Sequence, residues 1–193
     1  YGSQNVVGTF QSQGLGFSTD YVGSSAPGGV TGIPTLGAAY SNRWLAVQAA
    51  ASTAPGYLFF SPGLGLQFES GLKLGVVADL QVSGVQFDNA KFDIHYDLAN
   101  QSSLGLRAAI AVVTGVLDNI TLGWGKSWGS MITSLELQAD GTFGTFRLWP
   151  GMGIRFGSFE LSVSGDVARS SNWTVYADRL KVSSALRFGR SAF

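Results

Sequence analysis

The chain has 193 residues and no cysteine, which suits a single domain and excludes disulfide bonds and thiolate metal sites. Its 12 basic and 12 acidic residues give a net charge of zero, so long-range electrostatics would not attract nucleic acid. Only 12% of its residues are charged and 45% are hydrophobic, whereas an ordinary soluble domain is about 25% charged and needs that charge for its water-facing surface.

The N-terminal third gives a weak structural signal. Leu15, Phe17 and Tyr21 face one way in an alternating segment, and residues 24–34 are typical of a loop. Residues 38–63 are apolar without a clean period, so they define no register. No stretch approaches the roughly 18 uninterrupted apolar residues of a spanning helix, so any element that crosses a membrane has to be a strand.

From residue 64 onward, apolar and polar residues alternate in segment after segment. Side chains in extended backbone alternate faces with a period of two, so each segment is a strand with one apolar face. Each segment is close to the roughly 9–11 residues that a tilted strand needs to cross a bilayer. The residues that we expect to face lipid are Leu72, Leu74, Val76, Leu80, Phe92, Ile94, Leu104, Leu106, Ile110, Leu122, Leu135, Leu137, Phe159, Leu161 and Val163.

Turn-forming residues separate these segments. Ser70-Gly71, Asp88-Asn89, Asp118-Asn119, Asp140-Gly141 and Pro150-Gly151 combine residue types that favour turns. We therefore expect strands to end there, and we expect Lys91 to lie beside one of these turns.

Charged residues within the segments fall on the face opposite the apolar one. Such a face has too little charge for a solvated exterior but suits the lumen of a closed barrel, where opposite charges can pair and avoid the cost of burying a lone charge. The predicted lumen charges are Lys73, Asp79, Asp93, His95, Asp97, Arg107, Glu136, Arg147, Arg155, Glu160, Asp166, Lys181 and Arg187.

Aromatic residues lie near the expected strand ends, as in the interfacial girdles of membrane barrels. The alternative is that they form the core of a soluble sandwich or barrel. The scarcity of charge favours the membrane. The proposed girdle residues are Trp44, Tyr57, Phe59, Phe60, Trp124, Trp128, Trp149, Phe156, Trp173 and Tyr176.

In pattern and composition the whole chain resembles the small outer-membrane β-barrel proteins, the group that includes the OmpA-like barrels. Phe193 is similar to the C-terminal aromatic residue that assembly machinery reads in that family. The resemblance implies a bacterial outer membrane as location and membrane lipid as partner, with lipopolysaccharide and other envelope proteins as further candidates.

A sheet in lipid must close, because every backbone hydrogen-bonding group needs a partner inside the protein. We therefore predict an all-β fold: one closed antiparallel transmembrane β-barrel over residues 1–193. Strand numbers of single-chain bacterial barrels are even. The segments suggest about ten strands, with eight as the close alternative.

His95 is the one histidine and the best candidate for chemistry. Oriented by Asp93 or Asp97, it could act as a general base for Ser83 or Ser103 in a lipid-modifying enzyme. The simpler interpretation is a lumen polar group without catalytic function. Residues two apart on a strand are about 6.6 Å apart, which makes a metal site at Asp93, His95 and Asp97 awkward. We expect no metal and no cofactor.

The sequence therefore predicts a non-enzymatic outer-membrane barrel, either a structural component of the envelope or a narrow passive pore for small solutes, with a charge-paired lumen. Two alternatives remain: a lipid-modifying outer-membrane enzyme that uses His95, and a soluble lipid-binding β-barrel. The first would show lipid turnover that depends on His95, and the second would stay in water without detergent.

Overall fold

The computed structural model describes residues 14–26, 29–54, 56–170 and 179–188, and these residues form strands joined by short connections. Within this part of the chain, no helix is long and apolar enough to cross a membrane. The strands are β1 (Gly14–Ala26), β2 (Gly29–Ser41), β3 (Leu45–Ala54), β4 (Tyr57–Gln67), β5 (Leu72–Gln81), β6 (Gln86–Leu98), β7 (Ser102–Ala111), β8 (Val116–Trp128), β9 (Met131–Asp140), β10 (Phe146–Phe156), β11 (Phe159–Gly165), β12 (Ala168–Ser170) and β13 (Arg179–Phe188).

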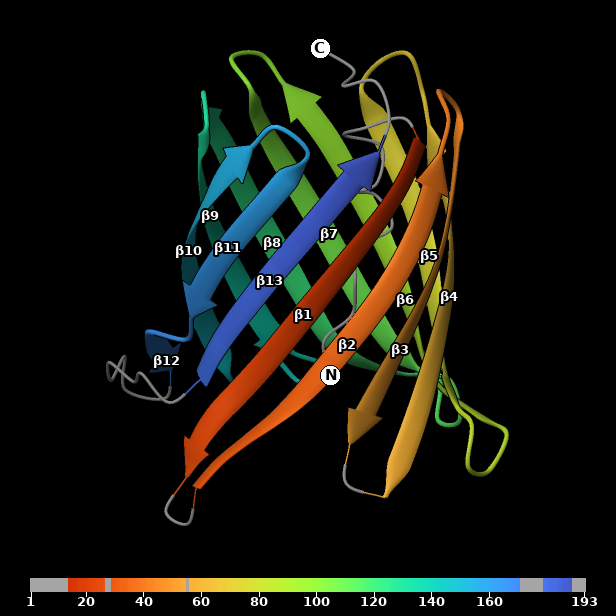
Figure 1. Ribbon diagram of the computed structural model, residues 1–193. Helices are drawn as coiled ribbons and strands as arrows, with labels where there is room; N and C mark the ends of the chain where they lie inside the picture. Colours follow the sequence, from red (N-terminus) through yellow and green to blue (C-terminus); the bar gives the residue numbers. More distant parts are fainter. Residues whose placement is uncertain (1–13, 27–28, 55, 171–178, 189–193) are drawn as a thin grey trace.

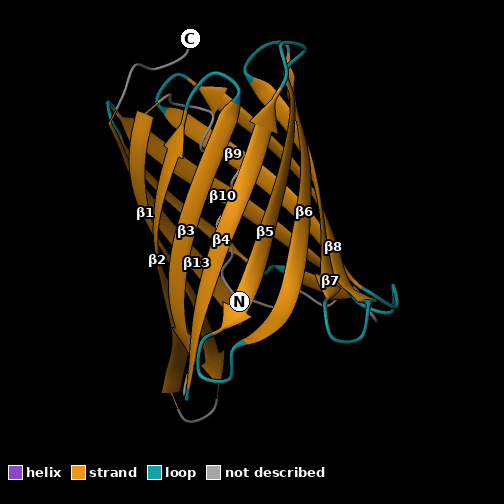
Figure 2. Cartoon of the chain, turned by 90° about the vertical axis from the view of Figure 1, so that its right-hand side faces the viewer, coloured by secondary structure: helices purple, strands orange, loops and turns teal. Residues whose placement is uncertain are grey.

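The sheet closes on itself as an antiparallel barrel. From β1 to β10 each strand pairs with the next, β10 pairs with β11, β11 with β13, and β13 with β1. The pairing of β1 with β13 runs from Leu15 opposite Phe188 to Ser24 opposite Arg179. Figures 1 and 2 show the strands crossing the wall obliquely around one enclosed interior. The predicted all-β closed antiparallel barrel is confirmed.

The barrel has twelve strand positions, so the expectation of about ten was wrong. β11 and β12 share one position, because both pair with the same neighbour, β10. The strands that the sequence did not resolve lie in the N-terminal third. There β2 and β3 are rich in glycine and alanine, as in the paired run from Gly37 to Ala39 opposite Gln48 to Ala50. Residues this small give little contrast between an apolar and a polar face.

Asp88-Asn89 and Asp118-Asn119 lie within strands, not in turns. The register shifts between Asp79 and Leu80 and again between Ala109 and Ile110, which leaves Asp88 and Asp118 as extra residues in β-bulges. The connections lie a few residues earlier, at 82–85 and 112–115. Asp and Asn tolerate the irregular backbone of a bulge as readily as that of a turn, which explains the wrong prediction.

Each bulge joins its hairpin to the next one along the wall. The carbonyl oxygen of Asp88 accepts a 2.9 Å hydrogen bond from the backbone N–H of Val112, and that of Asp118 accepts a 2.8 Å bond from Gly141. The connections of β5–β6, β7–β8 and β9–β10 are therefore linked in series. Figure 1 shows the first two projecting together from one end of the barrel.

The Pro150-Gly151 pair also lies inside a strand, β10, and not in a turn. Pro150 pairs with Leu135 of β9 on one side. On its other side the ladder is interrupted, because β12 pairs only up to Leu148 and β11 begins pairing at Gly151. A proline has no N–H to donate, so it fits where the neighbouring strand offers no regular partner.

Candidate functional site inside the barrel

The wall has one exposed and one buried face, and β5 shows the difference clearly. Val76 is 38% exposed, whereas its neighbour Val77 is 1% exposed. Lys73 and Asp79 share the face of Val77 and are 3% and 4% exposed. In a closed barrel that has apolar residues exposed on its outside, these buried charged groups line the interior.

The residues that we expect to face lipid lie on the outer face by register. Eleven of them are exposed, while Leu72, Leu74, Leu80 and Ile110 are half-buried. They pair with one another across strands, as Leu74 does with Ile94 and Leu106 with Leu122. The exposed members are Val76, Phe92, Ile94, Leu104, Leu106, Leu122, Leu135, Leu137, Phe159, Leu161 and Val163.

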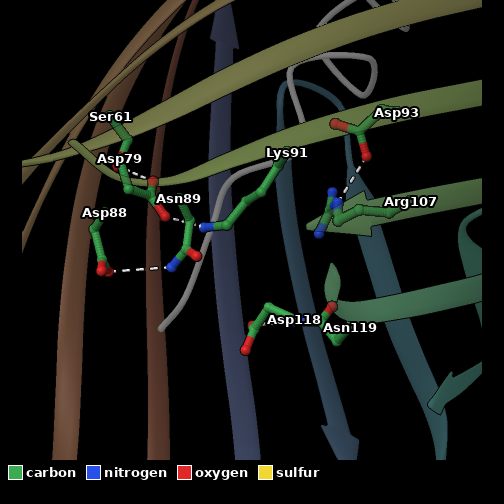
Figure 3. A network of polar contacts seen from close by, with 9 residues as sticks. All are labelled: Ser61, Asp79, Asp88, Asn89, Lys91, Asp93, Arg107, Asp118 and Asn119. Atoms are coloured by element: carbon green, nitrogen blue, oxygen red, sulfur yellow. Dashed lines mark hydrogen bonds and ion pairs between the residues drawn. The ribbon is translucent and has the colours of Figure 1, made fainter. Parts of the chain in front are cut away.

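The inner face carries a buried ion pair between Asp79 on β5 and Lys91 on β6, with Lys91 7% exposed. Ser61 on β4 donates a 2.7 Å hydrogen bond from Oγ to the other carboxylate oxygen, Oδ1 of Asp79. Figure 3 shows the ammonium group of Lys91 directed at Asp79. The expectation that Lys91 lies beside a turn was wrong. Its alternation in phase with Asp93 was the signal that could have placed it here.

Next to this pair, Arg107 on β7 donates a 2.6 Å hydrogen bond from Nε to Oδ1 of Asp93 on β6. The two residues are opposite each other in the strand register. Asp93 is 5% exposed, and its second oxygen, Oδ2, is buried without a hydrogen-bond partner. An ionised carboxylate in such a place depends strongly on the cation that donates a hydrogen bond to it, here Arg107 (Figure 3).

A second group of contacts lies near the end of β6. Lys73 Nζ is 2.6 Å from Asp97 Oδ2, and His95 Nε2 is 3.2 Å from Asp97 Oδ1. Gly105 faces His95 across the β6–β7 pair, and a Cβ added to Gly105 would lie 3.4 Å from Nδ1 of the ring. The carboxylate of Asp97 is therefore shared between two basic side chains.

On the opposite part of the wall, β10 and β11 carry another cross-strand pair. Arg155 contacts Glu160 Oε2 through Nη2 at 2.8 Å and through Nε at 3.2 Å. Arg147 Nη1 lies 3.8 Å from Oδ2 of Asp166, which is fully buried. Glycine, serine and threonine of β8 separate these pairs from those of β5–β7 on one side of the ring.

The remaining predicted lumen charges differ in their surroundings. Glu136 is exposed, and the described residues provide it with no ion pair. It lies opposite Gly123 on one side and Trp149 on the other. Lys181 is half-buried and faces inward by register with Ser164. Arg187 pairs with Gly16 in the register, but its side chain lies outside the described part of the structure.

Three residues of the proposed aromatic girdle lie on the inner face. Tyr57 shares the face of Phe59, and the two ring centroids are 6.4 Å apart. Phe59 is buried on the inner face of β4, and Trp149 shares the inner face with Glu136. The indole Nε1 of Trp149 is buried without a hydrogen-bond partner. Trp173, Tyr176 and the terminal Phe193 lie outside the described residues.

The structure separates Ser83 from His95, whereas it places Ser103 on the same face of the β6–β7 pair as His95. Ser83 lies in the connection at the start of β6 and accepts a 3.1 Å hydrogen bond from Gln81, whereas His95 lies near the other end of the same strand. Ser103 is opposite Asp97 in the register, and no hydrogen bond joins it to His95 among the described contacts. Within the described ranges, no three His, Asp or Glu side chains converge as metal ligands.

Comparison with known proteins places the fold among porins. No protein-family model matches the sequence, and no curated protein matches it significantly. The KdgM porin is 12% identical over 89% of this chain and 99% of its own, with a TM-score of 0.63. The KdgM porin in complex with disordered oligogalacturonate gives a TM-score of 0.61 at the same identity and coverage. At this identity the likeness is one of fold, and it does not single out the OmpA-like group.

Proposed function

We propose that residues 1–193 form a single integral β-barrel of a bacterial outer membrane, which serves as a narrow passive pore for small solutes. The observation that carries this proposal is the arrangement of the two faces. Apolar side chains are exposed around the outside of a closed wall, and opposite charges are paired on its inside. In water this outer face would be an exposed apolar patch far larger than those of monomeric soluble proteins. In a membrane the same face would contact the acyl chains of the lipid.

The inner charges support a pore with little preference for the sign of an ion. Among the residues whose side chains the structure describes, six bases and six acids lie on the inner face, and most of them are paired. The oligogalacturonate of the KdgM complex is a ligand of that protein. A balanced lumen offers no general attraction for such an acidic sugar. The bases are Lys73, Lys91, Arg107, Arg147, Arg155 and Lys181, and the acids are Asp79, Asp93, Asp97, Glu136, Glu160 and Asp166.

A structural component of the envelope is the second candidate. The Asp79–Lys91 pair is almost inaccessible to solvent, and so is Asp93, as expected where side chains fill the interior. Such a barrel would anchor other envelope proteins or contact lipopolysaccharide without conducting.

Conductance in planar lipid bilayers separates these two candidates. The purified full chain in detergent is added to one side, and steady single-channel steps are expected for the pore. If the protein shows heat-modifiable gel mobility and inserts into the bilayer but gives no conductance steps, the structural anchor is favoured over the pore. A chain that stays folded in water without detergent would overturn the membrane proposal and favour the soluble lipid-binding barrel.

A further inference from the structure

Lys126 is an exception to the charge pattern of the barrel. Lys126 follows Trp124 and precedes Trp128 by two residues, and all three lie on the outer face of β8. The register supports this placement, because Trp124 lies opposite Leu104 and Leu135, both of which are exposed. Lys126 is therefore a cation on the face that the proposed function assigns to lipid.

The surroundings hold Lys126 in place without neutralising it. Its Nζ atom lies 3.9 Å from the centroid of the Trp128 ring, a cation–π contact. Trp128 Nε1 donates a 3.1 Å hydrogen bond to Thr133 Oγ1 on β9, and this fixes the indole below the ammonium group. Thr133 in turn donates to the carbonyl oxygen of Lys126 at 3.4 Å. Among the described contacts, no carboxylate pairs with Lys126.

The depth of Lys126 in the wall suits a headgroup and not the acyl chains. It lies two residues before the end of β8, which is about 7 Å of extended chain. A charged side chain on the lipid face is strongly unfavourable at the bilayer midplane and nearly neutral at the interface. Tryptophan is enriched at that same level. A lysine between two outward tryptophans near a strand end therefore lies at the level of lipid phosphates.

From this arrangement we infer that Lys126, with Trp124 and Trp128 on either side of it, forms a binding site on the outer surface for the phosphate of an anionic glycerophospholipid, while Thr133 holds the Trp128 ring in place. The inference rests on the proposed membrane location. The ammonium group supplies the charge, and the two indoles pack against the glycerol and upper acyl region. An anionic lipid is favoured over a zwitterionic one, whose own ammonium group lies close to its phosphate and competes with Lys126.

Arg43 provides a matched control at the same end of the barrel. It lies in the connection that follows β2, and its guanidinium carbon is 4.8 Å from the centroid of the Trp44 ring. Unlike Lys126, it already has a carboxylate partner, because its Nη2 is 2.9 Å from Glu69 Oε1. Lys126 and Arg43 thus both stack on a tryptophan, but only Arg43 has a carboxylate partner.

Native mass spectrometry of the full chain, released from detergent with added phosphatidylglycerol or phosphatidylcholine, tests the inference. Lys126→Gln should weaken phosphatidylglycerol binding roughly five-fold, since one basic residue near an anionic surface contributes about a factor of that size. Lys126→Arg should retain the affinity, and Arg43→Gln should change it less than two-fold. Phosphatidylcholine binding should be the same in all variants.

Three results would overturn the inference: wild-type affinity in Lys126→Gln, an equal loss in Arg43→Gln, or displacement of the lipid by inorganic phosphate, which would indicate a free-anion site. Each variant is first checked for heat-modifiable gel mobility. A wild-type chain that needs no detergent would refute the proposed function itself, and this outcome does not depend on Lys126.

Discussion

Asp93 accepts a 2.6 Å hydrogen bond from Arg107 across the β6–β7 pair, while its other carboxylate oxygen is buried without a partner. The charge of Asp93 is thus balanced mainly by one guanidinium group. Arg107→Met should destabilise the barrel by about 3–5 kcal/mol, because it leaves an uncompensated buried charge. Urea unfolding in lipid vesicles measures this difference.

The companion variant is the double replacement Arg107→Met with Asp93→Leu. Removing both charges takes away the desolvation penalty together with the pair, so most of the lost stability should return. If the double variant is as unstable as Arg107→Met alone, the instability of Arg107→Met does not come from an uncompensated charge on Asp93.

Glu136 is expected to set the ion preference of the open pore. Glu136 and Asp97 are exposed acids of the inner face, but the described residues pair only Asp97 with a cation and provide Glu136 with no ion pair. Wild-type protein should show a permeability ratio of potassium to chloride near one, and Glu136→Lys should shift it toward chloride. The control is the double replacement Glu160→Gln with Arg155→Gln, because removing both members of this ion pair leaves the net charge of the lumen unchanged. Reversal potentials in a salt gradient give both ratios, and equal shifts in the two variants would contradict this assignment.

Leu106 distinguishes a lipid-facing wall from a water-facing one. It is 39% exposed in the middle of β7. In lipid, Leu106→Arg should cost about 2–4 kcal/mol near the bilayer midplane. In water the same change on an exposed side chain would stay within about 0.5 kcal/mol. Val85→Arg is the control, because Val85 is 87% exposed in the connection between β5 and β6. Folding yield into vesicles should fall for Leu106→Arg only.

Gly141 is expected to be indispensable for the β9–β10 connection. A Cβ at this position would overlap the backbone carbonyl of Leu117, and the Gly141 N–H bonds to Asp118 in the neighbouring hairpin. Gly141→Ala should therefore cost about 1–3 kcal/mol in urea unfolding, as overpacking does elsewhere. Gly84→Ala should be nearly neutral, since a Cβ there meets nothing within 4 Å. Equal stability of the two variants would show that the connection moves freely.

His95 tests the enzymatic alternative. Phospholipid turnover in mixed micelles should be absent from the wild-type protein and unchanged in His95→Asn, because among the described contacts the imidazole ring bonds to Asp97 and to neither Ser83 nor Ser103. Turnover that is present in the wild type and lost in His95→Asn would make the chain a lipid-modifying enzyme. His95→Gln is a second variant that keeps a hydrogen-bonding group next to Asp97.

Much of the wall could be predicted from the sequence, because burial in a barrel follows the strand period of two. From residue 64 onward the large apolar residues contrast with charged neighbours, and the two faces separate without knowledge of strand order. Between residues 29 and 54 a few large outward residues such as Leu36, Tyr40 and Val47 are separated by glycine and alanine on both faces, so the alternation was too weak to define a register and two strands were missed. The Asp-Asn pairs at 88–89 and 118–119 were misplaced because one residue pair is compatible with a turn and with a bulge.

The interior pairs could be predicted only as a set. Alternation assigned thirteen ionisable side chains to one face, but which acid pairs with which base depends on the strand register and on the bulges. The spacing is equally compatible with a pair between Asp93 and Lys91 or His95 on the same strand, whereas the structure places Arg107 opposite Asp93. Lys126 is the opposite case, a charged residue on the outer face. Its position there was recognised only from the register of β8 with β7 and β9.

The closure between β1 and β13 also constrains how the protein folds. Every other neighbouring pair is formed by segments close together in the chain, whereas Thr19 and Ser184, which hydrogen bond at this seam, are 165 positions apart. In an otherwise unfolded chain, bringing such distant segments together would cost about 4–5 kcal/mol of chain entropy beyond a constant, by the logarithmic dependence on loop length, and hairpins that form first reduce this cost. The hairpins along the wall can form one after another from segments that are close in sequence. The β1–β13 seam therefore contributes the contacts of largest sequence separation and is expected to form last. Until it does, the growing sheet has two open edges, and a chaperone or an assembly factor that occupies either one would control the rate at which the ring is completed.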